Sequence, residues 1–319
     1  GWPSRLLDSL GISSVLPKLP QRVLAVGAPV GPVLREFARR TGLSTGTLVV
    51  QGGVDSHAAM VGVGAIEPGS MAMIVGTSTC HMAQSAEPIF ADVWGPYPES
   101  VREGVYTIGG GQSTTGSIVN WLVNDVALGS IDYERIDDLA SEVPPGSEGL
   151  IALDFFQGNR TPYKDPLARG AVLGLTLRHG LAHICRAFYE ATAYGTRAII
   201  ENLAQHGYHV NRLLAAGGGT RSDLWMRIYA SVNGRTIEVA GNEEPTALGA
   251  AIWAGMGSGV FQDYEEAVNS MVAPGKPIMP DDSEKSVYDF YYSKYVELYE
   301  RLKPLMHDVA RFESDGVGI

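Results

Sequence analysis

The chain has 319 residues, 45% of them hydrophobic and 18% charged, an ordinary globular composition that allows one large or two moderate domains. Its net charge of −11 comes with lysines and arginines that are scattered singly, which argues against a nucleic-acid partner. No apolar run approaches the roughly 20 residues that a membrane-spanning helix needs, so no membrane partner is expected.

Cysteine and histidine usage narrows the chemistry further. The two cysteines, Cys80 and Cys185, form neither a CxxC pair nor a disulfide framework, so we expect a reducing, cytoplasmic location. The seven histidines show no metal-binding spacing, and no protein-held metal is predicted. The opening Gly1-Trp2-Pro3-Ser4 resembles neither a signal sequence nor a start, so we expect a chain that is entered partway.

The first predicted elements form a short run of helix and strand. Residues 4–10 predict a short helix that ends at Gly11, and residues 32–41 predict an amphipathic helix that ends at Gly42. Residues 47–51 predict a strand that breaks at two glycines and leads, past Asp55, into a helix over 58–63.

A unit of strand, glycine-rich turn and helix then recurs along the chain. The predicted strands cover 70–75, 106–108, 213–216 and 235–239, and helices are predicted over 117–126, 181–205, 222–231, 247–255 and 288–302. Glycine turns let a backbone approach a ligand, and the helix that follows offers unpaired N–H groups to anions. The recurrence favours an α/β architecture with ligand sites at the carboxyl ends of strands.

Asp55 is the first candidate for chemistry. It follows a strand and two glycines, so its carboxylate could accept the proton of a hydroxyl that attacks a phosphoryl group. The local sequence alone favours a plainer role, in which Asp55 caps the helix that starts at Ser56. His57, close by, is on the same local grounds more typical of a partner for a backbone carbonyl.

Two glycine clusters are candidates for nucleotide contact. Gly76-Thr77-Ser78 could hold phosphate through backbone N–H groups and hydroxyls, although this tripeptide also occurs in ordinary turns. The run from Gly217 to Ser222 could let a flat base lie close to the backbone, or could be only a tight strand-to-helix turn. Neither a GxGxxG nor a GxxxxGK[ST] pattern occurs, which weighs against a dinucleotide fold and a P-loop.

Taken in order, these elements resemble the FGGY family of carbohydrate kinases, within the sugar kinase, heat-shock ATPase and actin superfamily. Besides the elements around Asp55 and Gly76, the resemblance rests on 109–116 (GGGQSTTG), 160–170 (RTPYKDPLARG), 214–225 (LAAGGGTRSDLW) and 244–251 (EPTALGAA). Residues 76–81 and 94–97 resemble the ribulokinase-type branch, whose members act on pentuloses or related polyols.

The resemblance implies an actin-like, ribonuclease-H-like ATPase fold, with a mixed sheet flanked by helices. By the same resemblance, residues 1–64 form the tail of the family's N-terminal domain and residues 65–319 form its nucleotide-binding C-terminal domain. The family's opening Asp-x-Gly-Thr phosphate loop has no counterpart here. We therefore expect the family's N-terminal half as a partner, a poor kinase in its absence, and possible homo-oligomers.

The implied reaction is transfer of the γ-phosphoryl group of ATP, with Mg²⁺ held mainly by phosphates and waters, to a sugar hydroxyl. Asp55 would be the base, and Asp55 and His57 would contact the substrate. The implied nucleotide contacts are Gly76, Thr77, Ser78, Gly110, Gly111 and Gln112 for the phosphates, and Gly217, Gly218, Ser222 and Asp223 for the adenosine.

We further expect the turns at 76, 110 and 217 to converge on one cleft, because each would end a strand on the same side of one sheet. Two alternatives stay open. The first is a nucleotide-binding chain without catalysis, and the second is an ATPase of the actin or heat-shock type.

Overall fold

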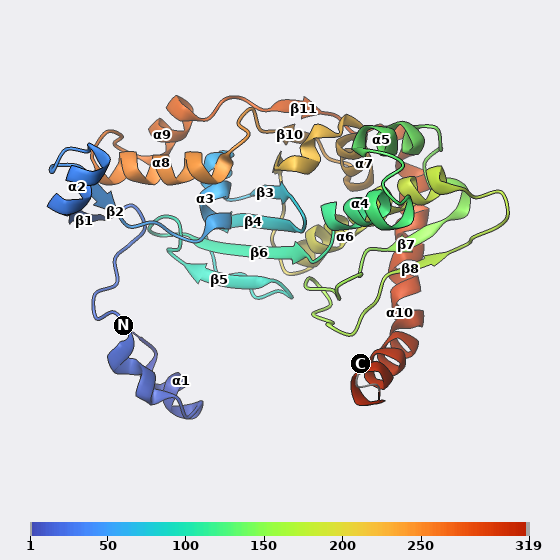
Figure 1. The fold of residues 1–319 in the computed structure, drawn as a ribbon, viewed down its shortest axis with the longest axis horizontal. Coiled ribbons are helices and arrows are strands. Elements are labelled where there is room, and N and C mark those ends of the chain that lie inside the picture. The colour runs from blue at the N-terminus through green and yellow to red at the C-terminus, as the bar shows by residue number, and fades with distance from the viewer. Residues whose placement is uncertain (1, 317–319) are drawn as a thin grey trace.

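A seven-stranded mixed sheet forms the centre of the computed structural model, which describes residues 2–316 (Figure 1). Its order is β11 (Lys276–Ile278), β10 (Ile237–Val239), β9 (Arg212–Ala216), β3 (Ser70–Val75), β4 (Thr79–Ser85), β6 (Tyr106–Gln112) and β5 (Trp94–Pro98). Strands β10, β9 and β3 are parallel, and the other pairs are antiparallel. Two small sheets pair β1 (Pro29–Pro32) with β2 (Leu48–Val50), and β7 (Ile151–Leu153) with β8 (Ala171–Leu173).

Alternation along the central strands gives the sheet two buried faces. Met71 and Met73 of β3 join one hydrophobic cluster, whereas Ala72 between them joins the other. The first cluster includes α4 (Gly116–Trp121), α5 (Tyr133–Ser141), α6 (Leu181–Gln205), α7 (Asp223–Asn233) and α10 (Lys285–Gly316). The second includes α3 (Asp55–Gly62), α8 (Pro245–Gly257) and α9 (Tyr264–Met271). Helices therefore cover both faces, as the sequence predicts.

Helices α3 and α8 cross at a point where both carry glycine. A Cβ atom at Gly62 would overlap the carbonyl oxygen of Pro245, and one at Gly249 would overlap the carbonyl oxygen of Ala58. Only glycine lets the two backbones approach this closely.

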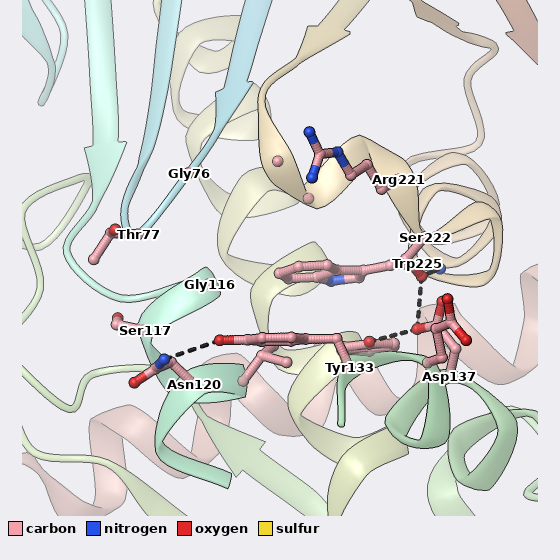
Figure 2. A pocket seen from close by; sticks show the side chains of 15 residues that line it. Gly76, Thr77, Gly116, Ser117, Asn120, Tyr133, Asp137, Arg221, Ser222 and Trp225 are labelled. Atoms are coloured by element: carbon pink, nitrogen blue, oxygen red, sulfur yellow. Dashed lines mark hydrogen bonds between the residues drawn. The ribbon is translucent and has the colours of Figure 1, made fainter. Parts of the chain in front are cut away.

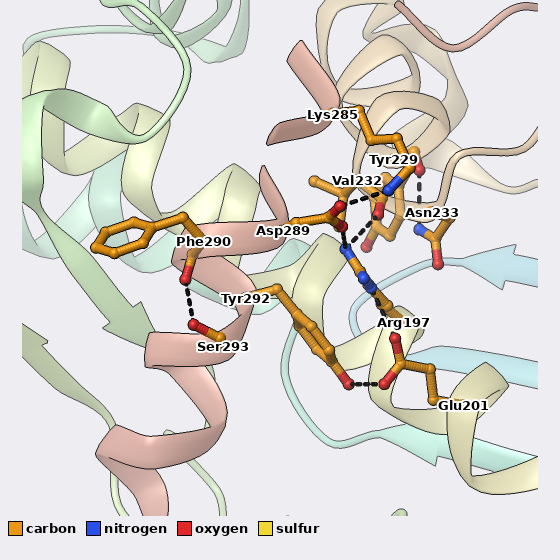
Figure 3. A network of polar contacts seen from close by, with 10 residues as sticks. All are labelled: Arg197, Glu201, Tyr229, Val232, Asn233, Lys285, Asp289, Phe290, Tyr292 and Ser293. Carbon is orange, nitrogen blue, oxygen red and sulfur yellow. Dashed lines mark hydrogen bonds and ion pairs between the residues drawn. The ribbon is translucent and has the colours of Figure 1, made fainter. Parts of the chain in front are cut away.

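One arginine of α6 contacts both the C-terminal helix α10 and α7 (Figure 3). Arg197 of α6 donates to Asp289 of α10 at 2.8 Å and to the carbonyl of Val232 in α7 at 3.3 Å. Its guanidinium also lies over the Tyr292 ring, 4.3 Å from the centroid. The tyrosines of α10 at helical spacing are accordingly packing residues, with Tyr288, Tyr295 and Tyr299 buried.

The segment before α3 is attached more loosely to this body. Helix α1 (Ser4–Ser9) buries no residue and lies apart from the sheet in Figure 1. Around α2 (Arg35–Thr41) and β2, Leu34 is 77% exposed, Phe37 51% and Val49 43%. This end of the molecule therefore presents an unusual number of apolar side chains to solvent.

Most predicted elements are present, with shifted ends. The bounds of β3 and α6 agree with the prediction, α3 begins three residues early, and the helix after residue 116 becomes a π-helix over Leu122–Val126. Strand β4 was not predicted. Short 3₁₀ helices cover Ser13–Lys18, Ser147–Gly149, Gly218–Arg221 and Asp282–Glu284. Among the described residues, none of the helices has both the length and the apolar character to cross a membrane.

Candidate functional site

A cavity of about 780 Å³ opens at the carboxyl end of the central strands (Figure 2). It lies between the turn after β3, the start of α4, helices α5 and α6, and the loop that joins β9 to α7. Its lining residues are Gly76, Thr77, Gly116, Ser117, Val119, Asn120, Tyr133, Glu134, Asp137, Tyr189, Gly218, Gly219, Arg221, Ser222 and Trp225. A smaller cavity of about 290 Å³ adjoins it at Gly218 and Arg221 and includes Gly217.

Strand direction explains why these loops meet. Strand β9 is parallel to β3, and β6 also runs in this direction because β4 is antiparallel to both β3 and β6. The carboxyl ends of all three strands therefore reach one edge of the sheet. The turns that begin at Gly76 and Gly217 converge there, as predicted.

The convergence at residue 110 was predicted wrongly. Strand β6 does not end at Ile108 but continues through Gln112, paired with β4 up to Thr79. Gly110 and Gly111 are consequently buried inside the sheet, where a Cβ atom would meet Thr161 and Trp94 respectively. Neither lines the cavity. These glycines serve close packing, and it is Gly116, farther along the same run, that reaches the cavity.

Gln112 is likewise a buried structural residue. Its side chain donates to Asp154 Oδ2 at 2.9 Å and to the Thr192 carbonyl at 2.8 Å, and it accepts from the Thr196 hydroxyl at 2.9 Å. Asp154 also accepts from Tyr295, and burial raises the pKa of its carboxyl to about 6. The prediction that Gln112 contacts a nucleotide is therefore not supported by its position.

The turn after β3 and the start of α4 are joined by backbone hydrogen bonds. Gly116 N–H donates to the Gly76 carbonyl at 3.0 Å, and Thr115 and Ser117 N–H donate to the Thr77 carbonyl, each at 3.1 Å. A Cβ atom at Gly116 would strike the Gly76 carbonyl oxygen, so glycine is required for this contact. The first turn thereby becomes a rigid edge of the cavity.

Several backbone N–H groups of the turn after β3 and of the loop after β9 make no hydrogen bond within the described residues. Within the described residues, Gly76 N–H donates to Ser78, whereas the N–H groups of Thr77, Ser78, Gly218 and Gly219 have no protein acceptor. Gly217 has a φ of +97°, which orients the loop that carries Gly218 into the cavity. Backbone donors of this kind suit an anion.

The opposite end of the cavity is aromatic. Trp225 of α7 stacks on Tyr189 of α6 with centroids 4.7 Å apart and planes 8° from parallel, and its indole N–H donates to the Thr192 hydroxyl at 2.9 Å. Tyr133 accepts a hydrogen bond from Asn120 at 2.9 Å (Figure 2). A flat ligand could lie against such rings.

Ser222 and Asp223 have different surroundings although they are adjacent. Ser222 lines the cavity, where its hydroxyl accepts from the backbone N–H of Trp225 at 3.0 Å and donates to Asp137 at 2.8 Å. Asp223 is exposed, paired with Lys276 at 3.0 Å, and Ser78 also lies outside the lining set. The structure thus brings together Gly76, Thr77, Gly218 and Ser222, with Gly217 in the adjoining cavity.

Asp55 and His57 lie on α3, outside both cavities. Val54 occupies the N-cap position, and exposed Asp55 is the first helical residue, with its carboxylate accepting from Ser56 N–H at 2.7 Å. The charges of Asp55 and of Arg160 both act on Cys80 of β4, whose pKa is raised chiefly by burial. His57 is buried, so its ring offers a sugar no contact surface in this structure. The same burial lowers the pKa of its imidazole.

Sequence reasoning missed the residues of α5 and α6 that line the cavity, among them Tyr133, Asp137 and Tyr189. A signal for α5 was present, since Asp132 precedes Tyr133 and caps the helix by accepting from Arg135 N–H at 2.9 Å. For Tyr189 no local signal exists, because it sits within a long helix that is buried along most of its length.

Comparison with known proteins matches this chain to one family and to kinases of known structure. The model of the "FGGY family of carbohydrate kinases, C-terminal domain" matches residues 71–258. The chain is 36% identical to a ribulokinase of Bacillus licheniformis over 88% of its own length and 54% of the relative's. It superposes on xylulose kinases from Rhodospirillum rubrum (TM-score 0.81, 31% identity) and Lactobacillus acidophilus (TM-score 0.86, 25% identity). These superpositions cover 94% and 95% of this chain, and 61% of each xylulose kinase.

Proposed function

The chain belongs to the FGGY family of carbohydrate kinases, and on this premise we propose that it forms the nucleotide-binding part of an ATP-dependent pentulose or polyol kinase. The observation that carries the proposal is the meeting of free backbone N–H groups and a stacked aromatic pair in one cavity. The substrate class is supported by the relatives' names, since ribulose and xylulose are both pentuloses. The family match also disfavours the actin-type or chaperone-type alternative.

The cavity would hold the nucleotide lengthwise. Phosphates would accept from the N–H groups of Thr77, Gly218 and Gly219, because these donors have no protein partner. The base would lie at the end of the cavity that Tyr189 and Trp225 line, where the edge of this buried, mutually stacked aromatic pair borders the cavity. The long axis of the bound nucleotide would thus run from the turn after β3 to α5.

Magnesium would enter with the nucleotide rather than through a protein site. Among the described residues there is no group of three or more histidine, cysteine, aspartate or glutamate side chains that could hold a metal ion. Mg²⁺ usually keeps several waters and binds substrate phosphates, whose charge it offsets. We assign no step of the reaction to this ion.

Asp55 is the residue that we propose as the general base. An exposed carboxylate at the start of α3 could accept the proton of a sugar hydroxyl as that hydroxyl attacks the γ-phosphoryl group. Asp55 lies outside the nucleotide cavity, and the chain spans little more than half the length of the ribulokinase it matches. We therefore propose that the sugar site is completed by a counterpart of the family's N-terminal half.

Nucleotide binding tests the proposal directly. We expect titration calorimetry to show weak ADP binding to the folded chain, and Gly218→Val to abolish it. A Cβ atom at Gly218 meets no other atom, so valine should fit the fold while occupying cavity space. Gly52→Val is the matched control, because Gly52 also has open space around its Cβ position and lies outside both cavities. A folded wild-type chain that binds no ADP at millimolar concentration would overturn the proposal.

A second measurement separates the enzyme from a nucleotide-binding chain without catalysis. The observation behind the non-catalytic alternative is that Asp55 lies outside both cavities. Adding ATP and a pentulose to this chain together with a relative's N-terminal half should release ADP if the proposal holds. Nucleotide binding without pentulose-dependent ADP release would favour the non-catalytic alternative.

A further inference from the structure

Three helices bring one carboxylate and two hydroxyl groups together at the aromatic end of the cavity. Asp137 of α5 accepts from the Tyr189 hydroxyl of α6 at 2.6 Å and from the hydroxyl of Ser222, the N-cap residue of α7, at 2.8 Å. Both bonds reach the same oxygen, Oδ1 (Figure 2). Two donors from two other helices therefore fix the orientation of this carboxylate.

This arrangement leaves one unused acceptor at the cavity. A phenol or serine hydroxyl has a single proton to donate, and Tyr189 and Ser222 both give theirs to Asp137. The Ser222 hydroxyl also accepts from the backbone N–H of Trp225. Within the described part of the chain, both side-chain hydrogen bonds to Asp137 reach Oδ1 and none reaches Oδ2, and the nearby Arg135 pairs with Asp138 and Glu142. A carboxylate oxygen can only accept, so a ligand that displaces water from this half-buried oxygen must offer it a donor.

Position indicates which part of a nucleotide would meet this oxygen. Thr77 and Gly116 lie at one side of the cavity in Figure 2 and Asp137 at the other, with the Trp225 ring between them. A nucleotide with its phosphates at Thr77 would place its base beside the rings and the outer edge of the base toward α5. The donor that adenine presents on that edge is its exocyclic amino group.

We propose that Asp137 is the base-specificity residue of this cavity, with Oδ2 accepting a hydrogen bond from the 6-amino group of adenine. The inference rests on the proposed nucleotide site and deepens it. A buried or half-buried polar group that is built to bind one partner rejects an analogue lacking that partner, because the group is then left unpaired. Tyr189 and Ser222 act as positioning residues, since they hold the carboxylate rather than the base.

The test compares two nucleotides that differ only in the amino group. Calorimetry is run with ADP and with purine riboside 5′-diphosphate, which lacks the 6-amino group, on the wild type and on Asp137→Ala. We expect the wild type to prefer ADP by about tenfold or more, the usual size for a hydrogen bond to a charged group. We expect the variant to bind both ligands within about twofold of each other.

Two further variants keep the test decisive. Asp138→Ala is the matched control, because Asp138 is the next residue of α5, is exposed and does not line the cavity, so the ADP preference should remain. Asp137→Asn retains an oxygen acceptor for Tyr189 and Ser222, and it replaces Asp137→Ala if circular dichroism shows that the alanine variant does not fold. With asparagine the preference should fall, because one carboxylate oxygen becomes an amide donor.

The outcomes separate this inference from the function it rests on. Wild-type binding of ADP with no preference over the deaminated analogue would overturn the inference and leave nucleotide binding standing. So would a preference that survives in both Asp137 variants. A loss of affinity for 2′-deoxy-ADP that depends on Asp137 would show that the carboxylate contacts the ribose instead. A folded wild type that binds neither nucleotide would overturn the proposed function, and this inference with it.

Discussion

At the scale of single residues, the position of Asp55 bears directly on its two interpretations. Val54 holds the N-cap position, and the Asp55 carboxylate accepts from the N–H group of the next residue. An asparagine oxygen could accept that bond equally well, so a structural role predicts that Asp55→Asn is harmless. A general base predicts the opposite, because a neutral amide cannot take a proton.

We therefore expect Asp55→Asn, in an enzyme that joins this chain to the family's N-terminal half, to lower kcat by about 10² to 10⁴-fold. ADP affinity should change little, because Asp55 lies outside the cavity. Asp263→Asn is the matched control, since the Asp263 side chain caps α9 and lies outside both cavities. A kcat within about threefold of wild type at saturating substrates would rule out the base assignment.

Asp154 predicts a pH dependence of stability. Burial raises the pKa of its carboxyl in the folded state to about 6, from an ordinary value of 3.8. A raised pKa means that the folded state binds the proton more tightly, so the contribution of Asp154 to stability is fully present below about pH 4 and is lost as pH rises through about 6. The shift corresponds to about 3 kcal/mol.

Urea unfolding at several pH values between 4 and 7.5 tests this expectation. The wild type should lose unfolding free energy relative to Asp154→Asn as pH rises through this range, because asparagine carries no titrating proton. Parallel curves for the two proteins would show that Asp154 titrates alike in the folded and unfolded states.

Residue-level prediction from sequence located cavity-lining residues where the local pattern marks the end of a strand. Gly76 and Thr77 follow β3 directly, Gly218 lies in the turn after β9, and a strand end is visible in the sequence. Asp137 and Tyr189 were missed because their position in the cavity depends on how α5 and α6 pack on α7, a tertiary contact that has no local signature. Gly110 and Gly111 misled the prediction because glycine in a crowded strand has the same local pattern as glycine in a turn.

At the scale of elements, the crossing of α3 and α8 depends on two glycines. A methyl group at position 249 would overlap the Ala58 carbonyl oxygen of α3, so Gly249→Ala must separate the helices. We expect a loss of about 1–3 kcal/mol of unfolding free energy, the usual range for overpacking. Gly52→Ala is the control, since nothing lies near its Cβ position. Equal urea midpoints for the two variants would contradict the crossing.

Element boundaries were predicted best where burial is uniform. Helix α6 and strand β3 have the predicted ends because their flanking turn residues interrupt a continuous apolar pattern. Strand β4 was missed because polar residues such as His81 and Gln84 are more typical of a loop than of a buried strand. Both are buried, and their hydrogen bonds go to Thr196 and Thr107, partners that the sequence does not reveal.

At the scale of the whole molecule, the apolar side chains before α3 call for a covering surface. Leu34, Phe37 and Val49 are each more than two-fifths exposed, and they lie on α2, its flank and β2. The chain spans 54% of the ribulokinase it matches. We propose that the counterpart of the family's N-terminal half covers these residues in a complete enzyme.

Without that cover, we expect the chain to associate with itself, because exposed apolar patches of this kind recruit partners. Sedimentation velocity at rising concentration should show growing species for the wild type. The double variant Leu34→Ser, Phe37→Ser should sediment as a smaller species, and because neither side chain is buried its unfolding free energy should stay within about 0.5 kcal/mol of wild type. The matched control is Leu177→Ser, fully exposed on the segment between β8 and α6, which should leave association unchanged. Adding a relative's N-terminal half should suppress association of the wild type, because that half would occupy the same surface. A wild-type chain that remains a monomer at all concentrations, or a double variant that associates as strongly as wild type, would show that this surface recruits no partner.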